Sequence, residues 1–218
     1  MCFSATASFV VGGSLAVVGV VTLRRAANRA ELPFASIPLL FGIQQLVEGL
    51  LWFSIQNEMP LLKTYTTYLF TMFSHLIWPI FVPYAVAMME PRTVMPWRSS
   101  AIWGFRITGM VVAVLLLQLV ATQPLTAVVD RHIIYVTPFF YDWPMMVAYV
   151  VATCIVCFFS THRMIQLFGL MVLAFFFVSW WFYTEALFSV WCFFAAILSG
   201  IIYMHSMRGH PATGEAAL

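Results

Sequence analysis

Seven stretches of the sequence are each long and apolar enough to cross a lipid bilayer, and no other feature constrains the fold as strongly. A spanning helix needs about 20 apolar residues, because a rise of about 1.5 Å per residue must cover about 30 Å of hydrocarbon. With 63% hydrophobic and 8% charged residues, the chain cannot cover itself with a polar surface in water. The predicted spans are residues 4–23, 34–55, 65–89, 100–122, 143–160, 163–183 and 185–206.

These spans predict an all-α fold, a single polytopic transmembrane bundle of seven helices that occupies residues 1–208. The small polar segment 209–218 is predicted to be a disordered cytoplasmic tail. The fifth span is short, and the last two spans form one apolar run whose break near Thr184 contains neither Gly nor Pro. Bundles with six or eight crossings therefore stay open as alternatives.

Positive charges are concentrated in alternate gaps between the spans, and this pattern predicts the orientation in the membrane. The outer segments contain only Lys63 and Arg131 if the N-terminus is outside. The inner segments then contain eight arginines: Arg24, Arg25, Arg29, Arg92, Arg98, Arg106, Arg163 and Arg208. We therefore expect an outside N-terminus and an inside C-terminus. The first span precedes its arginines, the reverse of a cleaved secretion signal, so we expect it to be retained.

The first span has small residues on one helix face, spaced three or four positions apart. These residues are Ala5, Ser8, Gly12, Ala16 and Gly19. Such a face lets two helix backbones approach closely in a medium that supplies no hydrophobic drive. The first helix is therefore predicted to pack deep in the bundle.

The longest outer segment, residues 122–143, is predicted to contain a short β-hairpin. β-Branched residues between Thr126 and Thr137 flank Asp130-Arg131, a pattern typical of two short strands and a turn. The hairpin would be either a lid over the outer mouth of the bundle or a solvated loop. Asp142 precedes Trp143-Pro144, which indicates an N-cap and an early helical proline.

Glu48 is the most anomalous residue, because it lies inside the apolar stretch 34–55. Gln44 and Gln45 precede it by four and three residues, so the three side chains share one helix face. A carboxylate at this depth is costly and should face the bundle interior with a partner. Glu48 is therefore a candidate metal ligand, proton carrier or general base, or else part of a structural hydrogen-bond network.

His75 is the second anomaly, in the apolar stretch 65–89. Thr71 precedes it by four residues on the same face, and Pro79 follows it by four residues. Because proline has no N–H, we expect a loosened backbone near His75. Consecutive helices joined by a short loop are usually neighbours, so a contact between Glu48 and His75 is predicted. A buried histidine with a purely structural role is the alternative.

Cys2 is the third candidate and should lie at the outer end of the first span, above Glu48. A thiolate, an imidazole and a carboxylate together suit zinc or another transition metal such as copper or iron. If the initiator Met were removed, the thiol and α-amine of Cys2 could also act as nucleophile and base. The simpler alternative is a small apolar residue that begins a helix. Glu185 is either a fourth ligand or a complement to the helix dipole.

Other sequence features exclude several kinds of site. The only lysine, Lys63, lies in a loop, which excludes a buried Schiff base. Cys154 and Cys157 have redox spacing, but their apolar neighbours favour ordinary packing. No phosphate-binding loop, His-Glu-x-x-His pattern or Gly-x-Ser-x-Gly elbow is present. The net charge of +2 is too small to indicate nucleic acid, so the lipid bilayer is the expected partner. A homo-oligomer or a membrane partner protein stays open.

The opening Met1-Cys2-Phe3-Ser4 resembles the start of a family of uncharacterised bacterial membrane proteins, which open with Met-Cys-(Phe or Trp)-Ser. Residues 37–49 and 74–79 are similar to further segments of that family. The resemblance covers nearly the whole chain and implies a seven-helix bundle in the bacterial inner membrane, but it brings no established activity. It implies that Cys2, Glu48 and His75 matter, because these residues lie in the matching segments.

The leading hypothesis is a buried metal site in the outer half of the bundle, for hydrolytic or redox chemistry on a lipid or small molecule. Cys2 and His75 would be ligands, and Glu48 would be a third ligand or the general base. The supporting residues are Gln44, Gln45, Thr71 and Glu185. The first alternative is a proton-coupled transporter or channel with Glu48 and His75 as a relay. The second alternative is a non-catalytic sensor or partner subunit.

Overall fold

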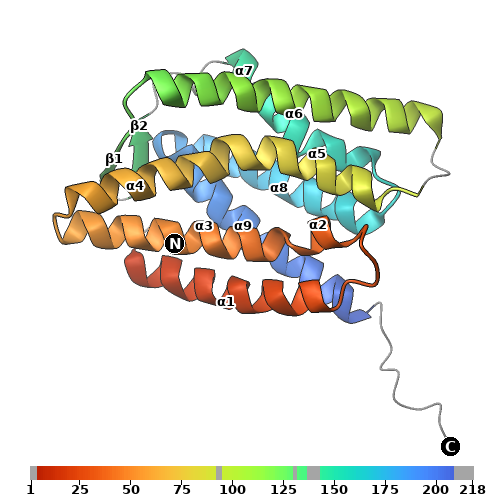
Figure 1. Ribbon diagram of the computed structural model, residues 1–218, viewed down its shortest axis with the longest axis horizontal. Coiled ribbons are helices and arrows are strands. Elements are labelled where there is room, and N and C mark those ends of the chain that lie inside the picture. The colour runs from red at the N-terminus through yellow and green to blue at the C-terminus, as the bar shows by residue number, and fades with distance from the viewer. Residues whose placement is uncertain (1–3, 92–94, 130–131, 137–142, 209–218) are drawn as a thin grey trace, which may run out of the picture.

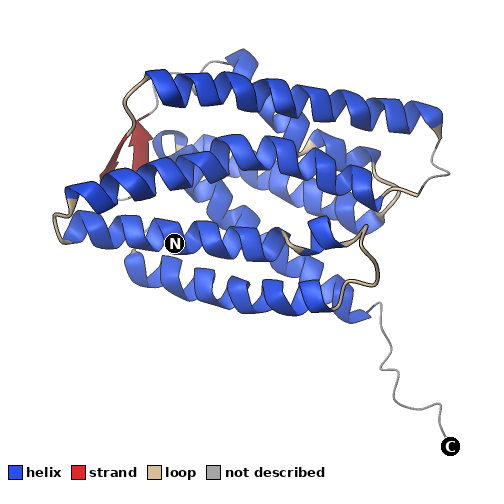
Figure 2. Ribbon diagram, viewed as in Figure 1, coloured by secondary structure: helices blue, strands red, loops and turns tan. Residues whose placement is uncertain are grey.

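The computed structural model describes residues 4–91, 95–129, 132–136 and 143–208, with side chains described as far as Met204. Most of this part of the chain is helical, and a small two-stranded sheet lies at one end of the bundle (Figures 1 and 2). The elements are α1 (Ala5–Arg24), α2 (Leu32–Ala35), α3 (Ile37–Gln56), α4 (Pro60–Thr71), η1 (Met72–Ile77), α5 (Trp78–Met89), α6 (Pro96–Thr122), β1 (Thr126–Val129), β2 (Ile133–Val136), α7 (Trp143–Thr153), η2 (Ile155–Phe159), α8 (Arg163–Phe182), η3 (Thr184–Ala186) and α9 (Leu187–Arg208). Cys2, Asp142 and the tail 209–218 lie outside the described residues.

In the described part of the chain, six helices are long and apolar enough to cross a membrane, which indicates an integral membrane protein and confirms the predicted all-α class. They are Ala5–Arg24, Leu32–Gln56, Pro60–Met89, Pro96–Thr122, Arg163–Phe182 and Thr184–Met204. The predicted fifth span is a shorter apolar helix, Trp143–Phe159, whose second part winds as a 3-10 helix. The predicted break near Thr184 is present, because Tyr183 leaves the helical conformation between α8 and α9.

The small face of α1 packs directly against α3, but the prediction that this helix lies deep in the bundle is wrong. Only 28% of its apolar stretch is buried, against 61% for the span that contains α3, because α1 uses a single face and lies at the edge of the bundle (Figure 1). A Cβ atom added to Gly19 would lie 2.4 Å from the backbone nitrogen of Leu39, and one added to Gly12 would lie 2.9 Å from that of Leu46. These pairs fix an antiparallel register in which each step forward on α1 is matched by one step back on α3. Only glycine permits the backbones of α1 and α3 to approach this closely, so Gly12 and Gly19 determine the distance between the two helices.

The predicted hairpin is confirmed, with β1 and β2 antiparallel and Thr126 opposite Val136. Its turn residues, Asp130 and Arg131, lie outside the described part. Ala127, Ile133 and Tyr135 are buried against Leu51, Trp52 and other residues of the bundle. The hairpin is therefore packed into the end of the bundle, where it is not a solvated loop (Figure 1). Tyr135 of β2 stacks on Phe70 of α4, with ring centroids 4.5 Å apart.

A π-helix, η1, interrupts the long helix from Pro60 to Met89 directly before Pro79. The N–H of Trp78 donates to the carbonyl of Phe73, five residues back, and Pro79 has no N–H to give. The carbonyl of Ser74 therefore lacks both of its usual helical donors. The hydroxyl of Tyr149 on α7 donates to this carbonyl instead. The sequence-based expectation of a loosened backbone near His75 is confirmed.

Candidate functional site

A group of buried polar side chains is contributed by α3, η1 and α9, in the half of the bundle nearer the hairpin. We call it the polar cluster, and its members are Gln44, Gln45, Glu48, Ser74, His75 and Ser189. Each has at most 1% of its surface exposed. The spacing of three and four residues on α3 directs all three of its polar side chains toward the bundle interior, as the sequence predicted.

Glu48 is held by α9. The hydroxyl of Ser189 donates to Oε1 of Glu48 at 2.5 Å, across 141 residues of sequence. One turn earlier on α3, Oε1 of Gln44 accepts a hydrogen bond of 2.7 Å from the indole nitrogen of Trp78. Trp78 in turn stacks on Phe41, with ring centroids 4.0 Å apart. The polar face of α3 is thus hydrogen-bonded to α9 through Glu48 and, one helical turn earlier, to α5 through Gln44.

His75 has a defined orientation within η1. The hydroxyl of Ser74 lies 3.0 Å from the carbonyl oxygen of Phe70, to which it donates. The same hydroxyl oxygen is 2.6 Å from Nδ1 of His75, so it accepts the Nδ1–H. This arrangement makes Nε2 the acceptor nitrogen of the ring. The imidazole packs against the ring of Phe188, with centroids 4.8 Å apart.

Glu48 and His75 therefore face two consecutive residues of α9, Ser189 and Phe188. The other two supporting residues are placed differently. Thr71 is buried, but its hydroxyl donates to the carbonyl of Thr67 in its own helix. Glu185 is exposed in η3 and does not share the burial of the polar cluster.

Several polar atoms of the cluster make no close hydrogen bond within the described residues. They are Nε2 of Gln44, both amide atoms of Gln45 and Oε2 of Glu48, all of them buried. The side chain of Gln45 nevertheless lies beside that of Glu48, and Gln44 lies beside Cys192. Ser8 Oγ on α1 and Trp52 Nε1 on α3 are in the same situation. Buried polar groups in proteins are nearly always paired with protein atoms, water or a bound group. Most of these atoms lie along one helix, and water or a bound group would have to supply the partners that the described residues do not.

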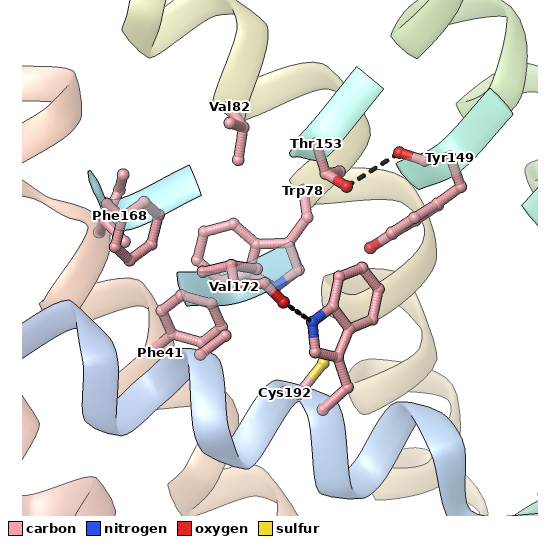
Figure 3. A pocket seen from close by; sticks show the side chains of 11 residues that line it. Phe41, Trp78, Val82, Tyr149, Thr153, Phe168, Val172 and Cys192 are labelled. Atoms are coloured by element: carbon pink, nitrogen blue, oxygen red, sulfur yellow. Dashed lines mark hydrogen bonds between the residues drawn. The ribbon is translucent and has the colours of Figure 1, made fainter. Parts of the chain in front are cut away.

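An apolar cavity of about 40 Å³ adjoins the polar cluster through Trp78 (Figure 3). The polar groups of its walls are already engaged: Trp191 Nε1 donates to the carbonyl of Val172 at 2.9 Å, and Thr153 donates to that of Tyr149. A water molecule needs two or more polar partners, so this cavity is expected to stay dry. It borders the polar cluster but cannot replace it as a site for a polar ligand.

Sequence reasoning identified neither Ser189, a member of the polar cluster, nor Tyr149, which donates a hydrogen bond to the carbonyl of Ser74 in the cluster. Ser189 is a single hydroxyl among apolar residues of α9, and a serine of this kind usually bonds to its own helix. The hydroxyl of Tyr149 donates to the carbonyl of Ser74, which has no donor within its own helix because of η1. The doublet of Pro79 and Pro83, which leaves carbonyls unpaired, is the sequence signal that could have pointed to a donor on another helix.

The described residues contain no group of three or more His, Cys, Asp or Glu side chains that could hold a metal ion. Cys2 lies outside the described part, so the set of Cys2, Glu48 and His75 stays a prediction. Glu48 on α3 and His75 on η1 are both buried and both contact α9, and the predicted contact between them stays a prediction.

Comparison with known proteins places the chain in a family without assigning a function. No curated protein matches the sequence, and no solved structure matches the fold. A family model described as "Family of unknown function (DUF6629)" matches residues 1–217. The resemblance inferred from the opening residues is confirmed, and the chain belongs to this family of unknown function.

Proposed function

We propose that this chain is a seven-span protein of the bacterial inner membrane that binds a transition-metal ion at Cys2, Glu48 and His75. The bound ion would serve hydrolytic or redox chemistry on a lipid or small molecule. The observation that carries the proposal is the row of buried polar atoms on α3 that lack partners among the described residues. An occupant is expected there, because an unsatisfied buried polar group costs about 1–3 kcal/mol.

The donor types in the polar cluster suit a metal such as zinc, copper or iron. His75 has its Nδ1–H bonded to Ser74, an arrangement that orients the ring and presents Nε2 as a ligand would. Glu48 has one oxygen bonded to Ser189 and keeps Oε2 for a ligand or for a proton. A nitrogen and a carboxylate oxygen are common donors for these ions, and a thiolate from Cys2 would complete a three-residue set.

The register of α1 against α3 makes the role of Cys2 physically reasonable. Extending the pairing of Gly12 with Leu46 puts Ser4, the N-cap of α1, near the level of Ser54. That level is six residues beyond Glu48, or about 9 Å along the helix. Two extended residues span about 7 Å, and the cysteine side chain adds further reach. The proposal therefore requires the segment before Ser4 to turn inward, toward the bundle axis.

The proposed orientation follows from the distribution of charge. Arg24, Arg98 and Arg163 lie at helix ends opposite the hairpin (Figure 1). If that end faces the cytoplasm, the hairpin and the polar cluster belong to the outer half of the bilayer. Burial of the hairpin against Leu51 and Trp52 would then separate the site from external water.

Metal analysis of the purified full-length protein tests this proposal. We expect about one zinc, copper or iron ion per chain, which is lost in Cys2→Ser and in His75→Gln. Cys157→Ala is the matched control, because Cys157 is a fully buried cysteine on η2 that packs beside Gly169 of α8 and is not a member of the polar cluster. The control should retain its metal. A folded wild-type protein that never carries metal, even after incubation with each ion, would contradict the proposal.

Proton-coupled transport is a second candidate, favoured by the π-helix that carries His75. A helix segment with a π-turn and two nearby prolines, Pro79 and Pro83, can change its hydrogen bonding at lower cost than a regular helix. Metal-free protein in liposomes would then take up protons in a manner that Glu48→Gln abolishes. If the variants lower stability and change neither property, the polar cluster is structural.

A further inference from the structure

A second polar pocket lies at the opposite end of the bundle from the hairpin, between the end of α5 and the first part of α6. Its volume is about 220 Å³, and Glu90, Ser99, Trp103 and Arg106 contribute the groups that can recognise a ligand. Ala87 and Ile102 add apolar walls. None of these residues belongs to the polar cluster, so this pocket needs a separate explanation.

Arg106 is a positioned cation in this pocket. Its guanidinium carbon lies 4.5 Å from the ring centroid of Trp103 and 6.0 Å from that of Tyr84. Both rings are within the range of a cation–π contact with the guanidinium. These ring contacts use the face of the guanidinium and leave its N–H groups unengaged. Its N–H groups are therefore available for a planar or tetrahedral anion such as phosphate.

Glu90 is a positioned anion in the same pocket. Its Oε1 accepts hydrogen bonds from the hydroxyl of Ser160 at 2.5 Å and from the backbone nitrogen of Thr161 at 2.9 Å. The same backbone nitrogen is 3.1 Å from Oε2. These bonds fix the carboxylate without neutralising its charge, and lone pairs remain on both oxygens.

We propose that this pocket binds the headgroup of a zwitterionic phospholipid with a primary ammonium group. The phosphate contacts Arg106 and the hydroxyl of Ser99, and the ammonium contacts Glu90. A ligand with both charges matches the pocket, whereas a simple anion would meet the Glu90 carboxylate and a simple cation would meet Arg106. An ammonium with three N–H donors can bond to a fixed carboxylate, and a trimethylated one cannot.

The surroundings of the pocket favour a lipid over a soluble molecule. Trp103 and Tyr84 are 56% and 40% exposed, as expected for aromatic residues at the level of lipid headgroups. The 27 residues of α6 span about 40 Å, so the helix extends beyond a hydrocarbon core of about 30 Å. Arg106 lies about 15 Å from the start of α6, a depth from which an arginine side chain can reach the headgroups.

Native mass spectrometry of the delipidated full-length protein, titrated with defined lipids, tests this assignment. The probes are phosphatidylethanolamine, phosphatidylcholine and phosphatidylglycerol with identical acyl chains. We expect the first lipid to bind about tenfold more tightly than either of the others. Arg106→Gln should weaken its binding about tenfold. Glu90→Gln should remove the preference over phosphatidylglycerol while it leaves binding through the phosphate.

Arg163→Gln is the matched control, because Arg163 is exposed at the same end of the bundle and does not line the pocket. It should bind lipid like the wild type. Comparing the three lipids on the unaltered protein keeps the test valid even if Glu90→Gln destabilises the fold. Equal binding of all three lipids would overturn the proposal, and so would equal losses in Arg106→Gln and Arg163→Gln.

Discussion

Glu48 and Glu90 are two glutamates of one helical bundle whose surroundings differ sharply. Glu48 is fully buried in the middle of α3 and accepts one hydrogen bond within the described chain, from Ser189. Glu90 is partly buried at the end of α5 and accepts bonds from Ser160 and Thr161 with both oxygens. The more deeply buried carboxylate thus has fewer partners, the reverse of what stability alone would favour.

The polar residues around the two glutamates also differ in how completely they are hydrogen-bonded. Around Glu90, the carbonyl of Ser160 accepts from Gln166 at 2.7 Å and from Arg98 at 3.5 Å, so the polar atoms satisfy one another. Around Glu48, the amide atoms of Gln45 and Nε2 of Gln44 have no partner among the described residues. A network that is satisfied internally holds helices together. A partly satisfied one is retained at a cost in stability, and binding of a ligand would explain its retention.

The largest expected effect on stability comes from disturbing the packing of α1 against α3, the helix that carries Glu48. Gly19→Ala places a methyl group 2.4 Å from the backbone nitrogen of Leu39, so α1 must move away from α3. We expect a loss of about 3 kcal/mol in the free energy of unfolding. Thermal unfolding in a mild detergent, followed by tryptophan fluorescence, measures it.

Gly13→Ala is the control for this change, because an added Cβ at Gly13 meets nothing within 4 Å. It should stabilise the protein by about 0.5–1 kcal/mol through helix propensity. Equal effects of the two substitutions would show that the small face of α1 does not set the packing around Glu48. The contrast between the two glutamates would then lose its structural basis.

The next effect compares the glutamates directly. Glu90→Gln keeps one carbonyl oxygen for Ser160 and Thr161 but removes the charge that strengthens both hydrogen bonds, and it should cost about 2 kcal/mol. Glu48→Gln keeps a carbonyl oxygen for Ser189 and changes only the oxygen that has no partner among the described residues, so we expect a change within about 0.5 kcal/mol. Chemical denaturation of both variants, without metal, gives the two values. A larger loss in Glu48→Gln would make Glu48 the structural glutamate.

The sequence predicted the parts of this molecule that follow from local periodicity. The apolar spans, the small face of α1, the hairpin and the shared face of Gln44, Gln45 and Glu48 all depend on residues close together in the chain. The same holds for the disturbed helix before Pro79. These features need only the helix or strand repeat and the chemistry of glycine and proline.

The sequence could not predict which distant residues complete the site. Ser189 reaches Glu48 across 141 positions, and Tyr149 reaches Ser74 across 75. Both contacts depend on how α7 and α9 are rotated about their axes, and nearly uniform apolar helices do not encode rotation in their own pattern. The pairing of Glu90 with Ser160 was missed for the same reason, since an acid at a helix end has many available partners.

The smallest expected effect on stability comes from two glutamines, Gln166 in the network around Glu90 and Gln45 in the polar cluster around Glu48. Gln166→Leu removes the donor to the carbonyl of Ser160 and should destabilise the protein by about 1 kcal/mol. Gln45→Leu removes a fully buried amide whose two polar atoms lack partners in the described chain, so it should stabilise metal-free protein by about 1 kcal/mol. Unfolding after treatment with a chelator measures both changes.

If Gln45→Leu also abolishes metal binding, the same side chain lowers stability and supports binding, as expected where a polar group is kept for a ligand. If Gln45→Leu destabilises the protein as much as Gln166→Leu does, the amide of Gln45 supports the fold, and the polar cluster is a scaffold like the network around Glu90.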